Sequence, residues 1–452
     1  MKVSVFLFIV LLSFPLQAKE VFTKETIAEY MTKENPYLFT AIGQEFIYRE
    51  KERYALGSFD TKLSAKYDKK EYPVSTGEYL GVSVDKPIEN GMEFSLGYRK
   101  AQGTQEYNNI KTSNQGEMKV GVKIPVFSVV HDMSKRKLDL YNASLQTSKY
   151  KFKSKDNLRL LYFKITSVYS KLLYSKSVVD LEQSLEQRAK TRKKIIEKKV
   201  LVGEVAKVAM LEASQQLINR HQRVVSALNI YENNLENFVK YLNISKSDFL
   251  KKYDLQVLSE MKHAVLVYAM QEAIENRADL KMYDYEVKQI DLKDKQTSLL
   301  QYPKFNVSLY GVHDFKYENG FKVALDMDFP FERRKYEAAS AENKIVIKNL
   351  QKTKEKKILD IRANLTTIHN SLRKTAKNID LSEQEVALVK ELETVEHKKY
   401  KLGISNLFML NQREIYTLTI KKKLLKYQLD YLLLEQELQK ERGDYGEIFL
   451  NL

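Results

Sequence analysis

Histidines and paired carboxylates are the residue types in this sequence that could support chemistry, and neither has the spacing that chemistry needs. Asp326 and Asp328 alternate with apolar residues, so a solvated or lumen-lining role on the polar face of a strand is more economical than acid–base catalysis. No cysteine, Gly-rich phosphate loop or nucleophile elbow is present. We therefore predict that the protein is not an enzyme and needs no cofactor or metal. The six histidines show no spacing typical of metal ligands: His131, His221, His263, His313, His369 and His397.

Two glycines indicate the elements that position the rest of the chain. Gly203 and Gly403 lie 200 positions apart, each in a long stretch without other glycine or proline, and each follows a Lys-Lys pair. Because Gly and Pro are the strongest punctuators of regular structure, a solitary glycine between two unbroken stretches predicts a sharp reversal between helices. The sequence thus predicts one long helical hairpin, made twice.

The stretches around these glycines are long enough for unusually extended helices. Residues 126–202, 204–302, 331–402 and 404–442 contain neither Gly nor Pro. A helix of roughly 70 residues extends on the order of 100 Å, so it must bury its apolar seam against other helices. Apolar residues recur at helical spacing, as in Leu161, Ile165, Val168 and Leu172, with Lys, Glu, Gln and Asn between them. We expect coiled-coil-like packing.

A different apolar period predicts strands in two other regions. Seven of the fifteen glycines lie between Gly57 and Gly116, where apolar and polar residues alternate in four segments, the first from Phe59 to Tyr67. Two more alternating segments follow residue 303, and turns are expected at Asn90-Gly91 and Asn319-Gly320. Such segments are typical both of a transmembrane β-barrel and of a soluble antiparallel sheet, and the strands alone leave both open. Because membrane barrels begin at about eight strands, six strands would need several copies to close one.

The two halves of the chain resemble each other except for an insertion. Pairing Phe59 with Phe305 gives an offset of 246 residues, whereas pairing Pro125 with Pro330 gives 205. The difference of 41 residues predicts an added piece in the first half, in the region from about Tyr79 to Gly116. We interpret the chain as a duplicated unit with one insertion.

The first eighteen residues suggest export. Lys2, a short apolar run and Ala18 have the features of a secretory signal peptide. No later segment has 18 uninterrupted apolar residues, so a helical membrane protein is not expected.

The net charge of +16 is spread along the chain with interleaved Glu, which favours solvated helix faces over a nucleic-acid site.

Strands followed by a long helix, a Gly turn and a returning helix, duplicated behind a signal peptide, resemble the TolC-like outer-membrane efflux proteins. The resemblance covers nearly all of the mature chain and depends on the order and spacing of several short pieces. They are Asn276 to Leu280, Asn35-Pro36, Phe329-Pro330-Phe331 with Arg333-Arg334, its counterpart Ile124 to Phe127, and the sequences around Gly203 and Gly403.

The resemblance implies an α+β membrane protein with no catalytic activity. In it, a homotrimer places its strands in one composite transmembrane β-barrel in the outer membrane and its helices in a long periplasmic α-barrel of coiled-coil helices. The implied function is a passive exit duct of a tripartite efflux pump or a type I secretion system. The implied partners are outer-membrane lipid, a periplasmic adaptor (membrane fusion) protein and an inner-membrane transporter. An exported coiled-coil structural or adhesive protein with a soluble sheet is the alternative.

This organisation assigns a role to each segment. Members of this family have two strands in each half of the chain and twelve strands in the barrel of the trimer. With the extra hairpin the barrel would have twelve or eighteen strands, and the sequence does not decide between them. The predicted segments are a signal peptide (1–18), an N-terminal helix and equatorial segment (19–55), strands of the first repeat (56–127) with an extra hairpin (79–101), a helical hairpin (128–242) with its tip near 203, an equatorial linker (243–258), a helix (259–302), strands of the second repeat (303–330), a helical hairpin (331–442) with its tip near 403, and a C-terminal tail (443–452).

The resemblance also places a functional site at the two glycine turns. The docking site for the adaptor would comprise the tip residues Val202, Gly203, Glu204, Val205, Leu402 and Gly403. The entrance constriction would comprise Tyr400, Ser405, Leu407, Phe408, Met409 and Gln412.

The entrance departs from some members of the family in its charges. Ala209 and Ser405 occupy the positions at which those members have an acidic residue and an arginine. Met409 and Gln412 occupy the positions of their pore carboxylates. A charged latch and an acidic pore ring are therefore not expected, and apolar packing of Leu407, Phe408 and Met409 would close the entrance instead. Tyr400 matches a tip tyrosine that helps to latch the closed state, and simple packing between helices explains it equally well.

Overall fold

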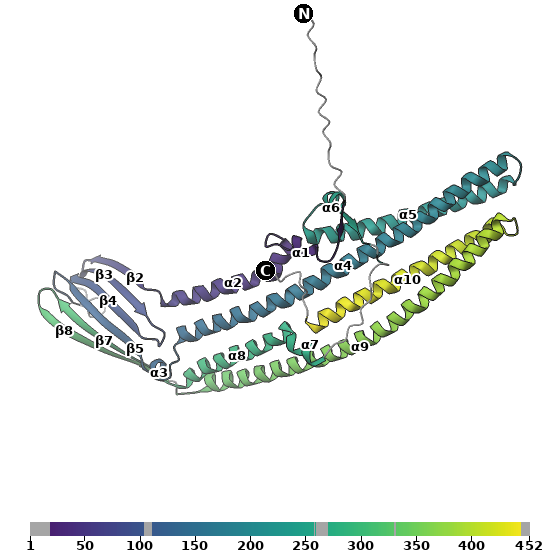
Figure 1. Ribbon diagram of the computed structural model, residues 1–452. Coiled ribbons are helices and arrows are strands. Elements are labelled where there is room, and N and C mark those ends of the chain that lie inside the picture. The colour runs from purple at the N-terminus through teal and green to yellow at the C-terminus, as the bar shows by residue number, and fades with distance from the viewer. Residues whose placement is uncertain (1–18, 104–110, 257, 259–269, 330, 444–452) are drawn as a thin grey trace, which may run out of the picture. The chain divides into compact units, whose positions relative to one another are not determined.

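Two long helical hairpins and one large sheet make up most of the structure, a computed structural model that describes residues 19–103, 111–256, 258, 270–329 and 331–443 (Figure 1). The first hairpin consists of α4 (Lys135–Leu201) and α5 (Lys207–Leu242), and the second of α9 (Arg334–Lys401) and α10 (Leu407–Arg442). Helices α5 and α10 both have 36 residues. Both end at a left-handed residue, Asn243 or Gly443, which is a common way to terminate a helix.

The six segments predicted as strands form one antiparallel sheet in the order β2-β3-β4-β5-β7-β8. The pairing of β5 with β7 joins the strands of the two halves. Both strands of the predicted extra hairpin, β3 and β4, lie within this sheet between β2 and β5. The strands are β2 (Lys62–Tyr72), β3 (Ser75–Pro87), β4 (Glu93–Gly103), β5 (Glu117–Pro125), β7 (Lys304–Asp314) and β8 (Glu318–Asp328).

One strand start and one turn differ from the sequence prediction. Strand β2 begins at Lys62 because Gly57–Phe59 form the short 3-10 helix η1. The turn at Asn90-Gly91 is confirmed, but the turn predicted at Asn319-Gly320 is wrong, since both residues lie in β8. The chain reverses earlier because an Asp314 carboxylate oxygen accepts the backbone N–H of Lys316 at 3.0 Å and that of Tyr317 at 3.3 Å.

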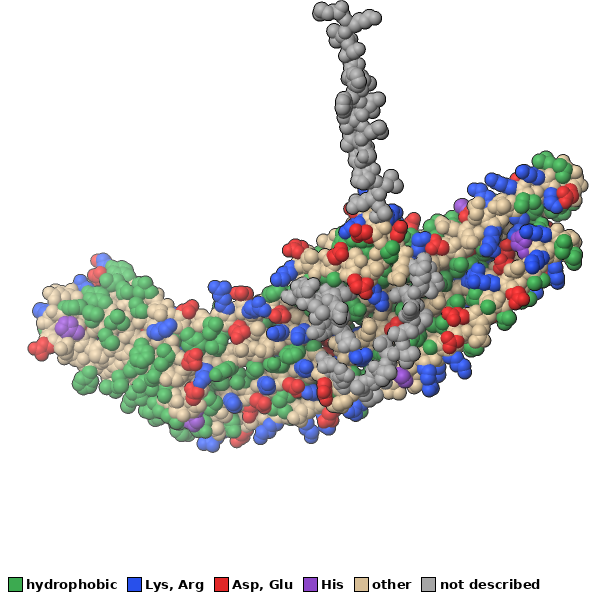
Figure 2. Space-filling view, in the orientation of Figure 1, with side chains coloured by type: hydrophobic (Ala, Val, Ile, Leu, Met, Phe, Trp, Pro, Cys, Tyr) green, Lys and Arg blue, Asp and Glu red, His purple; other side chains and the backbone are tan. Residues whose placement is uncertain are grey.

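The sheet has one apolar and one polar face. The cross-strand partners Leu63 and Val84, and likewise Leu309 and Val323, belong to the apolar face. These side chains are exposed in the single chain, up to 85% for Phe321 at the β8 edge. Figure 2 shows hydrophobic side chains gathered over the strands. An exposed apolar face of this extent marks a surface that meets lipid or another protein.

The chain divides into two compact units, and α4 and α9 contribute residues to both. The unit with the sheet also contains most of α2 (Pro36–Leu56), α3 (Val126–Val130), α7 (Met270–Asn276), α8 (Ala278–Ser298) and the 3-10 helix η3 (Leu299–Gln301). Polar and aromatic contacts join its helices. Tyr48 on α2 stacks on Tyr150 of α4 at 3.7 Å, and Lys149 of α4 pairs with Glu286 of α8 at 2.7 Å.

The other unit contains both hairpin tips, α1 (Ile27–Tyr30), α6 (Lys246–Lys252) and a parallel pair of short strands. These strands are β1 (Glu20–Phe22) and β6 (Tyr253–Leu255), so the predicted linker 243–258 contains a helix and a strand. An aromatic core centred on Phe22 stabilises the unit, since Tyr169, Phe238, Phe249 and Tyr253 all lie within 5.6 Å of its ring.

Two of the short pieces that carry the resemblance have clear structural roles. Buried Asn35 caps α2, because its side-chain oxygen accepts the N–H of Tyr37 and of Leu38. Arg277 breaks the predicted helix 259–302 between α7 and α8, and its guanidinium donates two hydrogen bonds to Asp279. The predicted signal peptide, residues 259–269 of that helix, Pro330 and residues 444–452 of the tail lie outside the described residues.

Candidate functional site

The turns at Gly203 and Gly403 have the same backbone geometry. Gly203 has a φ of 77° and Gly403 a φ of 73°, the left-handed region that favours glycine. After α4, the N–H of Glu204 donates to the Lys199 carbonyl at 2.9 Å, and the N–H of Gly203 to Val200 at 3.1 Å. After α9, Ile404 and Gly403 donate to Lys399 and Tyr400 at the same distances. This pair of bonds is the Schellman motif, which ends a helix and satisfies its last carbonyls.

The tips present apolar side chains to solvent. Val202 is 77% exposed and Leu402 is 74% exposed, and apart from the adjoining residues no atom lies within 4 Å of the position that a Cβ would take at either glycine. Glu204 pairs with Lys199, and this bond raises the pKa of the lysine. Val205, in the turn that connects α4 to α5, is half-buried. The tips therefore offer two small apolar surfaces with open space at each glycine.

The residues predicted for the entrance lie in two different environments. Leu407 is buried in an apolar cluster with Ile196 and Ala213, and Tyr400 is partly buried against that cluster. These residues come from all four long helices, so the cluster joins the two hairpins near their tips.

The remaining entrance residues lie at the start of α10. Phe408, Met409 and Gln412 are exposed. The side chain of Asn406 caps this helix by accepting the N–H of Met409 at 2.9 Å. Half-buried Ser405 donates a hydrogen bond to Glu396 of α9. The structure thus places Leu407 and Tyr400 inside the chain's own packing, and leaves Phe408, Met409 and Gln412 available to contact another molecule.

A buried ion pair that the sequence did not reveal also joins the two hairpins. Arg192 on α4 donates to both carboxylate oxygens of Glu414 on α10, at 2.5 and 3.1 Å, and to the Asn411 side chain at 2.9 Å. Glu414 and Asn411 are buried. Arg220 of α5 is buried nearby, where desolvation lowers the pKa of its guanidinium. Spacing alone could not find this group, because Arg192 is 219 residues from Asn411 and 222 from Glu414 and all of them lie among many other charges.

Further ion pairs follow the same contact between the hairpins. Lys422 of α10 pairs with buried Glu182 of α4, and Arg188 of α4 pairs with Glu393 of α9 at 2.8 Å. Because charged hydrogen bonds have defined geometry, these pairs fix how one hairpin lies along the other.

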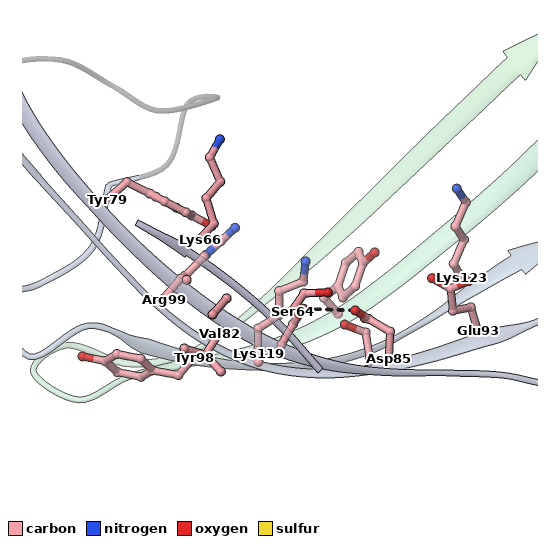
Figure 3. A pocket seen from close by; sticks show the side chains of 16 residues that line it. Ser64, Lys66, Tyr79, Val82, Asp85, Glu93, Tyr98, Arg99, Lys119 and Lys123 are labelled. Carbon is pink, nitrogen blue, oxygen red and sulfur yellow. Dashed lines mark hydrogen bonds between the residues drawn. The ribbon is translucent and has the colours of Figure 1, made fainter. Parts of the chain in front are cut away.

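The polar face of the sheet forms a shallow concavity of about 320 Å³. Figure 3 shows Lys66, Arg99 and Lys119 on the same side of the strands, with Tyr98 on the opposite side. Arg99 pairs with Glu117, and the Lys119 ammonium lies 3.7 Å from the centre of the Tyr310 ring. The face therefore carries charges of both signs, as expected of a surface in contact with water.

No group of three or more His, Asp or Glu side chains in the described part of the chain could hold a metal ion. None of the helices described has both the length and the apolar content to cross a membrane.

Comparisons with known proteins identify the fold but no sequence relative. No protein-family model matches the chain, and no curated protein does. The crystal structure of the outer membrane protein VceC from Vibrio cholerae aligns with a TM-score of 0.69 and 11% identity, covering 93% of this chain and 96% of that chain. The open state of the Neisseria gonorrhoeae MtrE outer membrane channel aligns at 0.70 and 13%, covering 93% and 89%. The Campylobacter jejuni CmeC outer membrane channel aligns at 0.70 and 11%, covering 93% and 85%. This chain therefore has the fold of these channels.

Proposed function

We propose that this chain, which has the fold of outer-membrane channels, is itself a TolC-like outer-membrane channel whose long helices extend into the periplasm. One observation carries the proposal: the likeness covers 93% of the chain and includes both the sheet and the helical hairpins. Substrates would pass through the channel without chemistry.

The faces of the sheet support a membrane wall. A strand in lipid needs an apolar face outward, while the lumen of a channel is polar. The strands have 9 to 13 residues, close to the 9 to 11 that cross a bilayer when tilted. Because the apolar face is exposed in one chain, contact with outer-membrane lipid would bury it. Each chain would contribute its sheet to a composite barrel in a homotrimer.

The duplicated hairpins support an α-barrel of the same trimer. The first helices of the two hairpins have 67 and 68 residues, and the second helices have 36 each. The matching Schellman turns, 200 residues apart, are consistent with two copies of one ancestral unit. The insertion in the first copy would then be the hairpin of β3 and β4.

The hairpin tips would dock a periplasmic adaptor protein. The exposed apolar side chains of Val202 and Leu402 and the bare backbone at Gly203 and Gly403 allow a partner hairpin to approach closely. Glu204 and Val205 would complete the first tip. An inner-membrane transporter would deliver the substrate through this adaptor, either for efflux or for type I secretion.

The entrance would be closed by exposed side chains at the start of α10. Phe408 and Met409 are available to meet their counterparts from other copies, whereas Leu407 and Tyr400 are engaged within the chain. Gln412 lies one turn further along the same helix, and Ser405 is engaged by Glu396. We propose apolar contacts of Phe408 and Met409, with no charged latch, as the constriction.

Membrane fractionation tests the proposed function. The expected result is a heat-modifiable trimer in the outer-membrane fraction that is extracted only with detergent. Release of the protein by osmotic shock without detergent would contradict the proposal.

A further inference from the structure

The sheet has two edge strands of equal length and complementary pattern. Within the described residues, β2 pairs only with β3 and β8 only with β7. Both edges have 11 residues. Because the six strands alternate in direction, β2 and β8 run antiparallel, so the β8 edge of one copy matches the β2 edge of the next.

We infer that β8 of one copy pairs with β2 of a second copy over their full length, with Asp328 opposite Lys62 and Lys322 opposite Asp68. The inference rests on the proposed trimeric channel and adds the register of its subunit contact. It also includes β3 and β4 in the barrel wall. Three copies of the six-stranded sheet then make a barrel of eighteen strands.

The alternation of side chains restricts the register first. In the stated register, Leu63 lies opposite Met327 and Tyr67 opposite Val323, so the apolar face continues from copy to copy. A slip of one residue would turn every apolar side chain of one strand to the polar face. Only slips by an even number of residues remain as alternatives, and a slip of two keeps the most of the pairing.

Charge then separates the remaining registers. In the stated register, two pairs of opposite charge face each other and no like charges do. A slip of two residues in one direction sets Lys66 opposite Lys322, and a slip in the other direction sets Lys70 opposite Lys322. Each shifted register keeps at least one pair of opposite charge, but like charges directly opposite destabilise a sheet. Neither Asp68 nor Lys322 has an ion-pair partner within the described part of the chain, so both are free to form the contact.

The stagger of the sheet is compatible with the same register and excludes one of the two shifted ones. The residue paired with Lys62 of β2 on the next strand is Asp85, and the same step repeated from strand to strand ends at Lys322 of β8. The intermediate partners are Ser95, Gly121 and Tyr310. If Lys322 pairs with Asp68 of the next copy, each copy adds a shift of six residues over six strands.

This shift sets the tilt of the strands. With about 3.3 Å per residue and about 4.8 Å between strands, it gives a tilt of about 35°. That value lies in the range of about 35–45° found in membrane barrels. The register with Lys66 opposite Lys322 would reduce the tilt to about 25°, outside this range. The register with Lys70 opposite Lys322 would give about 42°, within the range, so the like charges alone disfavour that register.

An eighteen-stranded wall changes what can pass through the outer membrane. With this tilt the barrel would be roughly 34 Å across between backbones, a size at which barrels leave an aqueous channel. The extra hairpin thus widens the outer end of the duct. The polar face, with Lys66, Arg99 and Lys119, would line it.

Disulfide cross-linking tests the register, because the chain has no cysteine of its own. We would compare Ser64→Cys/Asp326→Cys, which places the two thiols directly opposite, with Ser64→Cys/Ala324→Cys and Ser64→Cys/Asp328→Cys, which match the two shifted registers. Within one sheet the two edges are five strand spacings apart, about 24 Å, so any bond must join two copies. The single-cysteine variants are controls.

The expected result is that oxidation converts the first variant into covalent dimers and trimers, and the shifted variants at least five-fold less. Stronger cross-linking of a shifted variant would overturn the register. A protein that conducts in lipid bilayers but cross-links in none of the three variants would overturn the β2–β8 contact while leaving the proposed channel intact. The reversal Asp68→Lys should weaken the heat-stable trimer, and the added change Lys322→Asp should restore it; a trimer unaffected by Asp68→Lys would also count against the register.

Discussion

Arg192 on α4 holds Glu414 on α10 through two hydrogen bonds, at 2.5 and 3.1 Å, and the side chain of Glu414 is only 2% exposed. Two hairpins that are distant in sequence are therefore joined by a buried ion pair. A pair in such a position contributes little relative to an apolar pair, but the loss of one partner leaves an uncompensated charge.

The first prediction follows from this pair. Arg192→Met should lower the free energy of unfolding by about 3–5 kcal/mol, because it leaves the buried Glu414 carboxylate without its charged partner. The double variant Arg192→Met/Glu414→Leu should recover most of that loss. Denaturant unfolding of the purified protein measures both. The exposed pair Lys176 and Asp180 is the control, and Asp180→Asn should cost less than about 1 kcal/mol. Equal effects of the two single variants would argue against a buried network.

A second prediction concerns the backbone of the tips. Gly203→Ala or Gly403→Ala should each cost about 1–2 kcal/mol, because an alanine must adopt a left-handed conformation. Space is open at both positions, so the backbone alone causes this effect. Gly203→Asn is the matched control, since asparagine tolerates this conformation. Thermal unfolding checks the order Gly, Asn, Ala; an alanine variant as stable as the parent would contradict it.

A third prediction separates lipid-facing from lumen-facing strand residues. Leu309 and Ser308 are neighbours near the middle of β7 and project from opposite faces. Leu309→Lys should lower the free energy of barrel assembly by about 2–4 kcal/mol, as a lysine near the bilayer centre does. Ser308→Lys should have little effect. The yield of heat-modifiable trimer in outer membranes is the measurement, and equal yields would exclude a lipid-facing apolar side.

A fourth prediction distinguishes the constriction from the packing beneath it. Phe408→Ala removes an exposed side chain, so it should leave stability within about 0.5 kcal/mol and increase the conductance of the closed channel. Leu407→Ala removes a buried one and should cost about 2–5 kcal/mol. Unfolding and single-channel recordings on the same preparations separate these effects. A Phe408→Ala channel with parental conductance would place the constriction elsewhere.

A fifth prediction uses pH. The buried Tyr169 hydroxyl donates to the Phe22 carbonyl at 2.7 Å, and burial raises the pKa of this phenol above 10 in the folded protein. Above pH of about 10 the unfolded chain loses this proton while the folded chain keeps it, so the stability that Tyr169 adds is present at lower pH and falls as pH rises.

The matched variant for that measurement is Tyr169→Phe. It should be about 1 kcal/mol less stable than the parent at pH 8, because the hydrogen bond is lost. The difference should shrink between pH 8 and pH 11, since the variant has no proton to lose at this position. A constant difference over that interval would show that Tyr169 does not titrate differently in the two states.

Most of the helical architecture could be predicted from glycine spacing and apolar period. Gly203 and Gly403 mark the turns because only a left-handed residue completes a Schellman motif easily, so the physical requirement is visible in one residue type. The strands were predictable from their alternation, but the turn after β7 was misplaced. There the Asp314 side chain, rather than the Asn-Gly pair, reverses the chain.

The features that could not be predicted from the sequence depend on tertiary contacts. Arg192 and Glu414 are common residue types on charged helices, and only the packing of the two hairpins makes them partners. Likewise, the sequence left the place of the extra hairpin open. The pairing of β3 with β2 and of β4 with β5 puts it in the sheet, because its apolar residues continue the face of its neighbours.

Recording from a planar lipid bilayer tests the central proposal most directly. Purified protein in detergent would be added to one side of the bilayer at fixed voltage, with a heat-denatured sample as the control. The account predicts discrete upward steps of conductance, each from the insertion of one trimeric channel. A folded, trimeric preparation that leaves the bilayer without conductance steps would contradict it.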